Sequence, residues 1–132
     1  MTKVNYRIIY ADTDQMGIVY HANYLKYFEI LRGEVMRENG LTYHDFETMG
    51  FSLPVIESHC EYKYPAKYDD VIEITGFVSE LKGLKMKFEC EIHCSDKLIC
   101  KGYTIHTCLN KDGRPIKFPE QLIKLYEKSL KI

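Results

Sequence analysis

The chain has 132 residues, of which 45% are hydrophobic and 28% charged, and its formal net charge is −1. This length and balance predict one soluble domain with a single sizeable core. The near-neutral charge gives no electrostatic basis for nucleic-acid binding, because proteins that bind nucleic acid usually present a basic face.

The N-terminus carries no apolar segment of the signal-peptide kind, since residues 1–7 enter a strand-like pattern at once. No apolar run approaches the roughly 18–20 residues that a membrane-spanning helix needs. The five cysteines are odd in number and include no C-x-x-C pair, which favours free thiols in a reducing compartment. We therefore expect a cytoplasmic protein without a membrane span. A zinc site at His93 and Cys94 is disfavoured, because neighbouring strand residues point to opposite faces.

The first part of the chain predicts a strand, a loop and two helices. Residues 3–10 alternate as a strand does, whereas residues 11–20 break every periodicity and predict a loop. Residues 22–39 predict a long helix, which Asn23 or a neighbour could cap. Residues 42–49 predict a short second helix. The apolar face of the long helix has the expected spacing and consists of Tyr24, Tyr27, Phe28, Leu31 and Val35.

The second part of the chain is nearly all sheet. We expect strands at residues 53–67, 71–81, 84–95 and 98–109, with connections short enough for antiparallel pairing. A C-terminal helix is expected over residues 119–128, opened by a favourable proline. One early helix followed by a long antiparallel sheet predicts an α+β domain.

A single long helix cannot cover both faces of a five-stranded sheet. If the sheet curls around the helix at residues 22–39, the remaining surfaces or an edge strand are free to meet another subunit. Closed symmetric oligomers are the usual outcome of such pairing. We therefore expect a homodimer or a homotetramer.

The loop before the long helix concentrates groups that can do chemistry. Asp12, Asp14, Gly17 and His21 fall within ten residues. Carboxylates and imidazoles move protons near neutral pH, and a helix N-terminus adds unpaired amides and a partial positive charge. A blander interpretation stays open, because loop aspartates near helices often only form turns or caps. No Gly-x-Ser-x-Gly elbow and no phosphate-binding loop is present.

The same loop and the helix after it carry a recognisable pattern. Residues 10–29 resemble the 4-hydroxybenzoyl-CoA thioesterase family of hotdog-fold enzymes, most closely its YbgC-like acyl-CoA thioesterase branch. The order of strand, loop, long helix and antiparallel strands also fits a hotdog domain, in which a five-stranded antiparallel sheet wraps around the helix. The matching positions are Tyr10, Asp12, Thr13, Asp14, Gly17, Ile18, Val19, Tyr20, His21, Asn23, Tyr24 and Glu29.

The resemblance implies roles for individual residues. Asp14 falls where the family has its catalytic carboxylate, and His21 where a second active-site residue lies at the helix start. Tyr10 matches a tyrosine associated with activity in the YbgC-like branch. A different branch places its catalytic carboxylate on the central helix, where Glu29 lies, but the intact loop favours Asp14.

The remaining residues of the motif are expected to bind substrate or hold the loop. Gly17 would let the loop approach the substrate closely. Val19, Tyr20 and Ala22 belong to the substrate-binding segment, where amides near Tyr20–Ala22 would polarise the thioester carbonyl. Asp12 would close the loop and could tune Asp14.

The resemblance implies a thioesterase that hydrolyses acyl-CoA to CoA and a carboxylic acid. The loop aspartate would act as general base or as nucleophile, and no metal or cofactor is required because CoA is part of the substrate. An acyl carrier protein is a further candidate partner. The rival hypothesis is a non-catalytic module that binds acyl-CoA or acyl carrier protein on the same fold. Candidate contacts for the CoA phosphates are Lys63, Lys67, Lys82, Lys85 and Arg114.

Overall fold

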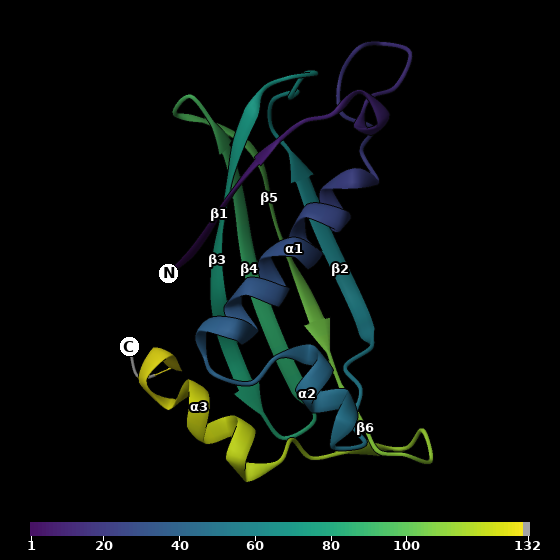
Figure 1. Cartoon of the computed structure of the whole chain (residues 1–132), viewed down its shortest axis with the longest axis vertical. Helices are drawn as coiled ribbons and strands as arrows, with labels where there is room; N and C mark the ends of the chain where they lie inside the picture. The colour runs from purple at the N-terminus through teal and green to yellow at the C-terminus, as the bar shows by residue number, and fades with distance from the viewer. Residues whose placement is uncertain (131–132) are drawn as a thin grey trace.

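The computed structural model describes residues 1–130, of which residues 128 and 129 are described by their backbone alone. The chain forms one curled sheet around a long helix (Figure 1). This arrangement confirms the predicted α+β class and the hotdog fold. The elements in chain order are β1 (Thr2–Arg7), the 3-10 turn η1 (Tyr10–Asp12), α1 (Asn23–Glu38), α2 (Tyr43–Thr48), β2 (Val55–Tyr62), β3 (Val71–Lys82), β4 (Lys85–Cys94), β5 (Lys97–His106), β6 (Cys108–Leu109), β7 (Pro115–Ile116) and α3 (Glu120–Leu130).

The main sheet has five strands in the order β1-β3-β4-β5-β2, and every neighbouring pair is antiparallel. Side chains of β3 and β4 alternate between buried and partly exposed positions, as expected for a sheet with one face on the core. Strands β1 and β2 form the two edges, at opposite ends of the sheet.

The helix α1 lies close against the sheet because two strand positions carry no side chain. A Cβ atom at Gly76 on β3 would stand 2.4 Å from Leu31 Cδ2, and one at Gly102 on β5 would stand 3.0 Å from Phe28 Cε2. Both helix residues are completely or almost completely buried. Glycine at these two positions therefore sets how deeply α1 sits in the curled sheet.

Several predicted boundaries are wrong. The first strand ends at Arg7 rather than at residue 10, because Tyr10–Asp12 tighten into a 3-10 turn. The strand expected over residues 53–67 is limited to β2. The last predicted strand, 98–109, divides at Thr107 into β5 and β6. Strand β6 then pairs with β7 in a small second sheet that the pattern did not predict.

Candidate active site

The loop between β1 and α1 is a small hairpin tied to the rest of the sheet. Thr13 bridges Val19 across it, and the Asp14 amide donates to the Ile18 carbonyl at 2.9 Å. Gly17 turns the chain with a φ of 79°, a conformation that favours glycine. The Val19 amide donates to Ala66 just before β3, at 2.9 Å. The loop therefore has a defined position at the N-terminal end of α1 (Figure 1).

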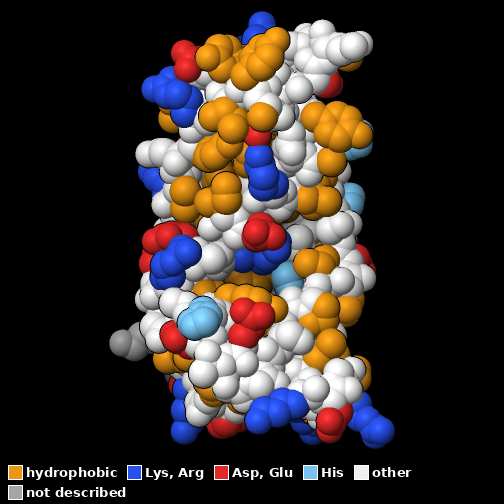
Figure 2. All heavy atoms as spheres, turned by 45° about the vertical axis from the view of Figure 1, so that its right-hand side comes forward, with side chains coloured by type: hydrophobic (Ala, Val, Ile, Leu, Met, Phe, Trp, Pro, Cys, Tyr) orange, Lys and Arg blue, Asp and Glu red, His pale blue; other side chains and the backbone are white. Residues whose placement is uncertain are grey.

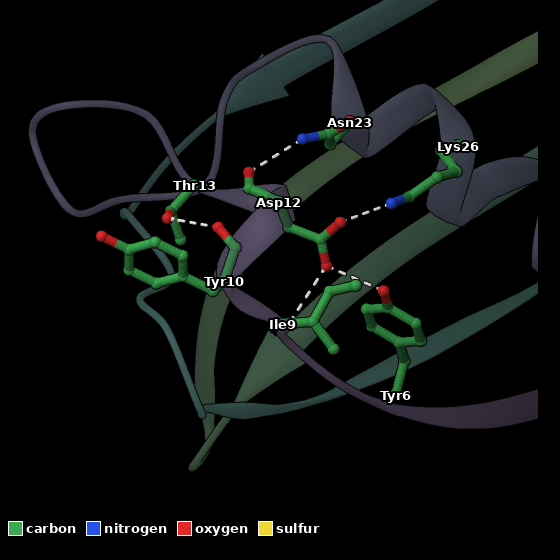
Figure 3. Close-up of polar contacts among 7 residues, drawn as sticks. All are labelled: Tyr6, Ile9, Tyr10, Asp12, Thr13, Asn23 and Lys26. Atoms are coloured by element: carbon green, nitrogen blue, oxygen red, sulfur yellow. Dashed lines mark hydrogen bonds and ion pairs between the residues drawn. The ribbon is translucent and has the colours of Figure 1, made fainter.

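Asp12 anchors this loop, and its carboxylate points toward Tyr6, Ile9 and Lys26 (Figure 3). The residue is only 1% exposed. Its Oδ2 accepts hydrogen bonds from the Tyr6 hydroxyl at 2.8 Å and from the Ile9 amide at 3.2 Å. Its Oδ1 accepts from Lys26 Nζ, which reaches back from α1. Asp12 therefore joins β1, the turn and the helix, which supports the structural role expected for it.

The backbone and charge of Asp12 strengthen the same junction. Its carbonyl accepts from Asn23 Nδ2 at 2.8 Å and from the Tyr20 amide at 2.9 Å. Burial alone would raise the pKa of the Asp12 carboxyl, but the bonds from Lys26, Tyr6 and Ile9 hold this pKa below its ordinary value. Asp12 is therefore a carboxylate at neutral pH, satisfied by structural contacts.

Asp14, two residues later, has a different environment. It is half-buried at the tip of the hairpin, and its Oδ1 accepts from the Met16 amide at 2.8 Å. Its Oδ2 meets no hydrogen-bond donor among the described residues. One oxygen is thus oriented by the loop, while the other is free to act on a substrate.

The start of α1 bears on two predictions, the cap at Asn23 and the free amides near Tyr20–Ala22. Asn23 does not cap the helix. Ala22 occupies the cap position without a side-chain bond, because the Asn23 amide group is directed to the Asp12 carbonyl. The Tyr20 amide also donates to Asp12. Within the described part of the chain, the backbone amides that keep no acceptor here are those of His21 and Ala22.

Aromatic side chains surround this end of the helix. The His21 ring is exposed and lies 4.6 Å from the Tyr20 ring and 6.2 Å from that of Tyr62 on β2. Tyr10 is 79% exposed and meets Tyr68 edge-on at 5.7 Å. No hydrogen bond joins Asp14 to His21 or Tyr10 among residues 1–130. The structure thus places all three predicted catalytic residues in the same loop region, but without direct contacts between them.

The remaining predicted residues divide into backbone and surface positions. Val19 is buried in the core, so only its backbone lines the loop. Gly17 and Ala22 are exposed. Glu29 is exposed on α1 and needs no buried partner.

Three residues at this junction were missed from the sequence: Tyr6, Lys26 and Tyr62. Lys26 follows the polar face of the helical pattern, and its pairing with Asp12 arises only when the loop folds back over α1. Tyr6 alternates like any strand residue. Tyr62, at the end of β2, reaches His21 and Tyr24 only through the sheet topology.

Neither a metal centre nor a membrane helix is apparent in the described residues. Residues 1–130 contain no group of three or more His, Cys, Asp and Glu side chains placed to hold an ion. None of the helices described is long and apolar enough to cross a bilayer.

The chain is similar to known proteins over most of its length. The model of the thioesterase-like superfamily matches residues 10–125. YneP of Bacillus subtilis is 33% identical, over 89% of this chain and 87% of its own. The acyl-CoA thioesterase YbgC of Haemophilus influenzae is 31% identical, over 88% of this chain and 87% of its own. The DHNA-CoA thioesterase of Staphylococcus aureus superimposes with a TM-score of 0.91 at 27% identity, covering 97% of this chain and 89% of that one.

Proposed function

The chain belongs to the thioesterase-like superfamily, and we propose that it hydrolyses acyl-CoA thioesters with Asp14 as the reacting carboxylate. One observation carries the proposal: in the hairpin that precedes α1, Asp14 holds one oxygen against the Met16 amide, and its other oxygen meets no donor among the described residues. The similarity to the acyl-CoA thioesterase YbgC of Haemophilus influenzae supports acyl-CoA as the substrate class.

The helix N-terminus polarises the thioester carbonyl. The backbone amides of His21 and Ala22 donate to the carbonyl oxygen as negative charge develops there, since the Tyr20 amide is already bonded to Asp12. Donors of this kind, fixed before the reaction, stabilise a tetrahedral intermediate without reorganising. Gly17, with its positive φ, allows the tight turn at the hairpin tip, which lies beside the reacting carbonyl.

Two routes are consistent with this arrangement. As general base, Asp14 removes a proton from water, the hydroxide attacks the carbonyl carbon, and the C–S bond breaks to release the CoA thiolate. As nucleophile, the Asp14 carboxylate attacks the carbonyl, the thiolate leaves, and water hydrolyses the mixed anhydride. His21 and Tyr10 contact the substrate at the rim of the site, and His21 protonates the departing thiolate.

Lys67 is the favoured contact for the CoA phosphates. It pairs with Ile18 beside the hairpin and takes part in no ion pair among the described residues. Lys63 and Lys85 are less suitable, because they already pair with Glu61 and Glu80. An acyl carrier protein could present the same thioester to the same loop.

A second copy of the chain pairs along β2, giving a homodimer or a tetramer of two such dimers. Strand β2 is a sheet edge with open backbone groups, and its residues are exposed except for half-buried Cys60. Antiparallel two-fold pairing brings the Tyr62 end of one strand beside the Val55 end of the other. The enzyme works in the cytoplasm, a reducing compartment in which its five cysteines stay free thiols.

Thiol release from short, long and aromatic acyl-CoAs tests the proposal. Wild-type protein should hydrolyse at least one of them. If every thioester binds and none is hydrolysed, the non-catalytic binding module is the better account. Single turnover in ¹⁸O-labelled water separates the two routes, because label enters the Asp14 carboxylate only in the nucleophilic one.

The contribution of the His21 side chain is tested separately. In a folded His21→Ala protein the backbone amide remains in place. A small loss of turnover would assign the main role to this amide, and near-total loss would assign it to the imidazole.

A further inference from the structure

A groove of about 710 Å³ lies between the second half of α1 and the segment leading into β2, away from the hairpin. Figure 2 brings this side of the molecule forward and shows charged and histidine side chains gathered with apolar ones around a hollow. Leu53 and Val55 supply part of its apolar lining. Its polar lining comes from α1, α2 and β5 and consists of Glu29, Arg32, Glu34, Arg37, Tyr43 and His106. A volume of this size is typical of a small-molecule site.

Arg32 is the unusual residue of the groove. It is half-buried, and burial lowers the pKa of its guanidinium, although an arginine remains charged at neutral pH. No hydrogen bond or ion pair joins it to any described residue. By contrast, Arg37 on the same helix pairs with Glu34 at 2.9 Å. A partly desolvated guanidinium with five N–H donors favours an oxygen-rich partner.

A second donor faces the same groove. The Tyr43 hydroxyl accepts a bond from the Leu53 amide at 3.4 Å, so its own hydrogen remains available to donate. Its charge interaction with Arg32 shows that the two groups are near one another. Arg32 and Tyr43 thus offer donors to this part of the groove. The exposed Glu29 carboxylate is also near Arg32, but it forms no ion pair with Arg32 among the described residues.

His106 adds neither charge nor a free donor. Its Nδ1 lies 3.0 Å from the Leu53 carbonyl and its Nε2 lies 2.9 Å from Thr104 Oγ1. Burial lowers the pKa of this histidine to about 4, so the ring is neutral at pH 7. Arg37 and Glu34, which also line the groove, pair with each other, and Glu29 is exposed. The positive charge that stays unpaired in the groove, among the described residues, is therefore that of Arg32.

We propose that this groove binds the far end of the acyl group and selects acyl-CoAs whose chain ends in a carboxylate. The Arg32 guanidinium pairs with the carboxylate and the Tyr43 hydroxyl donates to it, while the apolar wall contacts the methylene chain. This inference rests on the proposed thioesterase function. In the β2-paired dimer, the Tyr62 end of the partner's β2 lies beside Val55, which lines this groove. Because Tyr62 contacts His21 of its own loop, the acyl group runs from the partner's loop into the groove.

The test compares dicarboxylic monoacyl-CoAs (succinyl, adipoyl, suberoyl and sebacoyl) with methyl-terminated acyl-CoAs of equal chain length. For each pair we expect kcat/KM to favour the carboxylate at one or more lengths in the wild type. Arg32→Met should reduce this preference by about tenfold or more, and Arg32→Lys by less, because it keeps the charge but loses the planar fork. Arg7→Met is the matched control and should leave the preference unchanged, since Arg7 lies outside the groove and pairs with Asp69.

Three results would overturn the inference. The wild type could favour the methyl-terminated chain at every length. Arg32→Met could lower kcat/KM equally for both classes, or it could change only thermal stability or the subunit equilibrium, which would indicate a structural role. Failure of the proposed function looks different: no thioester would be hydrolysed, yet a thioether analogue of suberoyl-CoA would still bind wild type more tightly than Arg32→Met.

Discussion

Asp12→Asn should destabilise the protein far more than the neighbouring Asp14→Asn. Both donors to Oδ2 of Asp12, the Tyr6 hydroxyl and the Ile9 amide, can still bond to an asparagine oxygen. They lose their charged acceptor, however, which costs about 1 kcal/mol each. The Lys26 ion pair is lost as well. It contributes no more than about 1 kcal/mol, because the Lys26 side chain is 45% exposed.

The expected loss of unfolding free energy is therefore about 2–3 kcal/mol for Asp12→Asn. For Asp14→Asn it is below about 0.5 kcal/mol, because an asparagine oxygen can still accept from the Met16 amide. Urea unfolding at pH 7, followed by circular dichroism, measures both. Adding Lys26→Met to Asp12→Asn should cost less than the sum of the single changes. Equal stability of Asp12→Asn and wild type, or a larger loss in Asp14→Asn, would refute the division of roles between the two carboxylates.

Three further outcomes follow from burial and packing. Gly102→Ala should destabilise the protein strongly or prevent folding, since its Cβ would stand 2.0 Å from the His59 carbonyl oxygen. Gly33→Ala on α1 should instead stabilise it by up to about 1 kcal/mol, because the nearest new contact is 3.5 Å away. Thermal melting of the two variants and wild type measures both effects. The pKa of His106 is about 4 in the folded protein, against an ordinary value of 6.5. Between these pH values the unfolded chain binds more protons, so the free energy of unfolding should fall as pH drops from 6.5 to 4. His106→Gln should weaken this pH dependence in urea titrations, and an unchanged pH dependence would exclude His106 as its source. The stabilisation from Asp12 is lost at lower pH. Because the pKa of its carboxyl is lowered in the folded protein, this stabilisation disappears only as pH falls below the ordinary value of 3.8. Asp12→Asn should therefore lose less stability than wild type between pH 4 and pH 2.

Much of the fold could be predicted because its periodicities are clear. The helical face of α1 and the alternation of β3 and β4 each follow one repeat, and the antiparallel order follows from short connections. The predictions failed where a tertiary contact overrides a local pattern. Residues 8–10 alternate like a strand, yet the Asp12 side chain bonds back to the Ile9 amide and turns the chain. Asn23 has a capping side chain, but the folded loop offers it the Asp12 carbonyl instead.

The candidate site shows the same division. Asp14, His21 and Tyr10 could be located in one loop because they are close in sequence. The groove at Arg32 could not be, because it joins α1 to residues near Tyr43, Leu53 and His106, which meet only through the sheet topology. A helical sequence pattern also does not predict that the Arg32 guanidinium is unpaired, because arginine is an ordinary residue on the surface of a helix.

The central claim is that Asp14 carries the hydrolysis while Asp12 holds the loop. Its most direct test is turnover of the best acyl-CoA substrate by Asp14→Asn, compared with wild type at matched folded fraction. We expect kcat to fall by at least about a hundredfold, with substrate binding and melting temperature unchanged. Turnover within a few-fold of wild type would contradict the claim and move the chemistry away from Asp14.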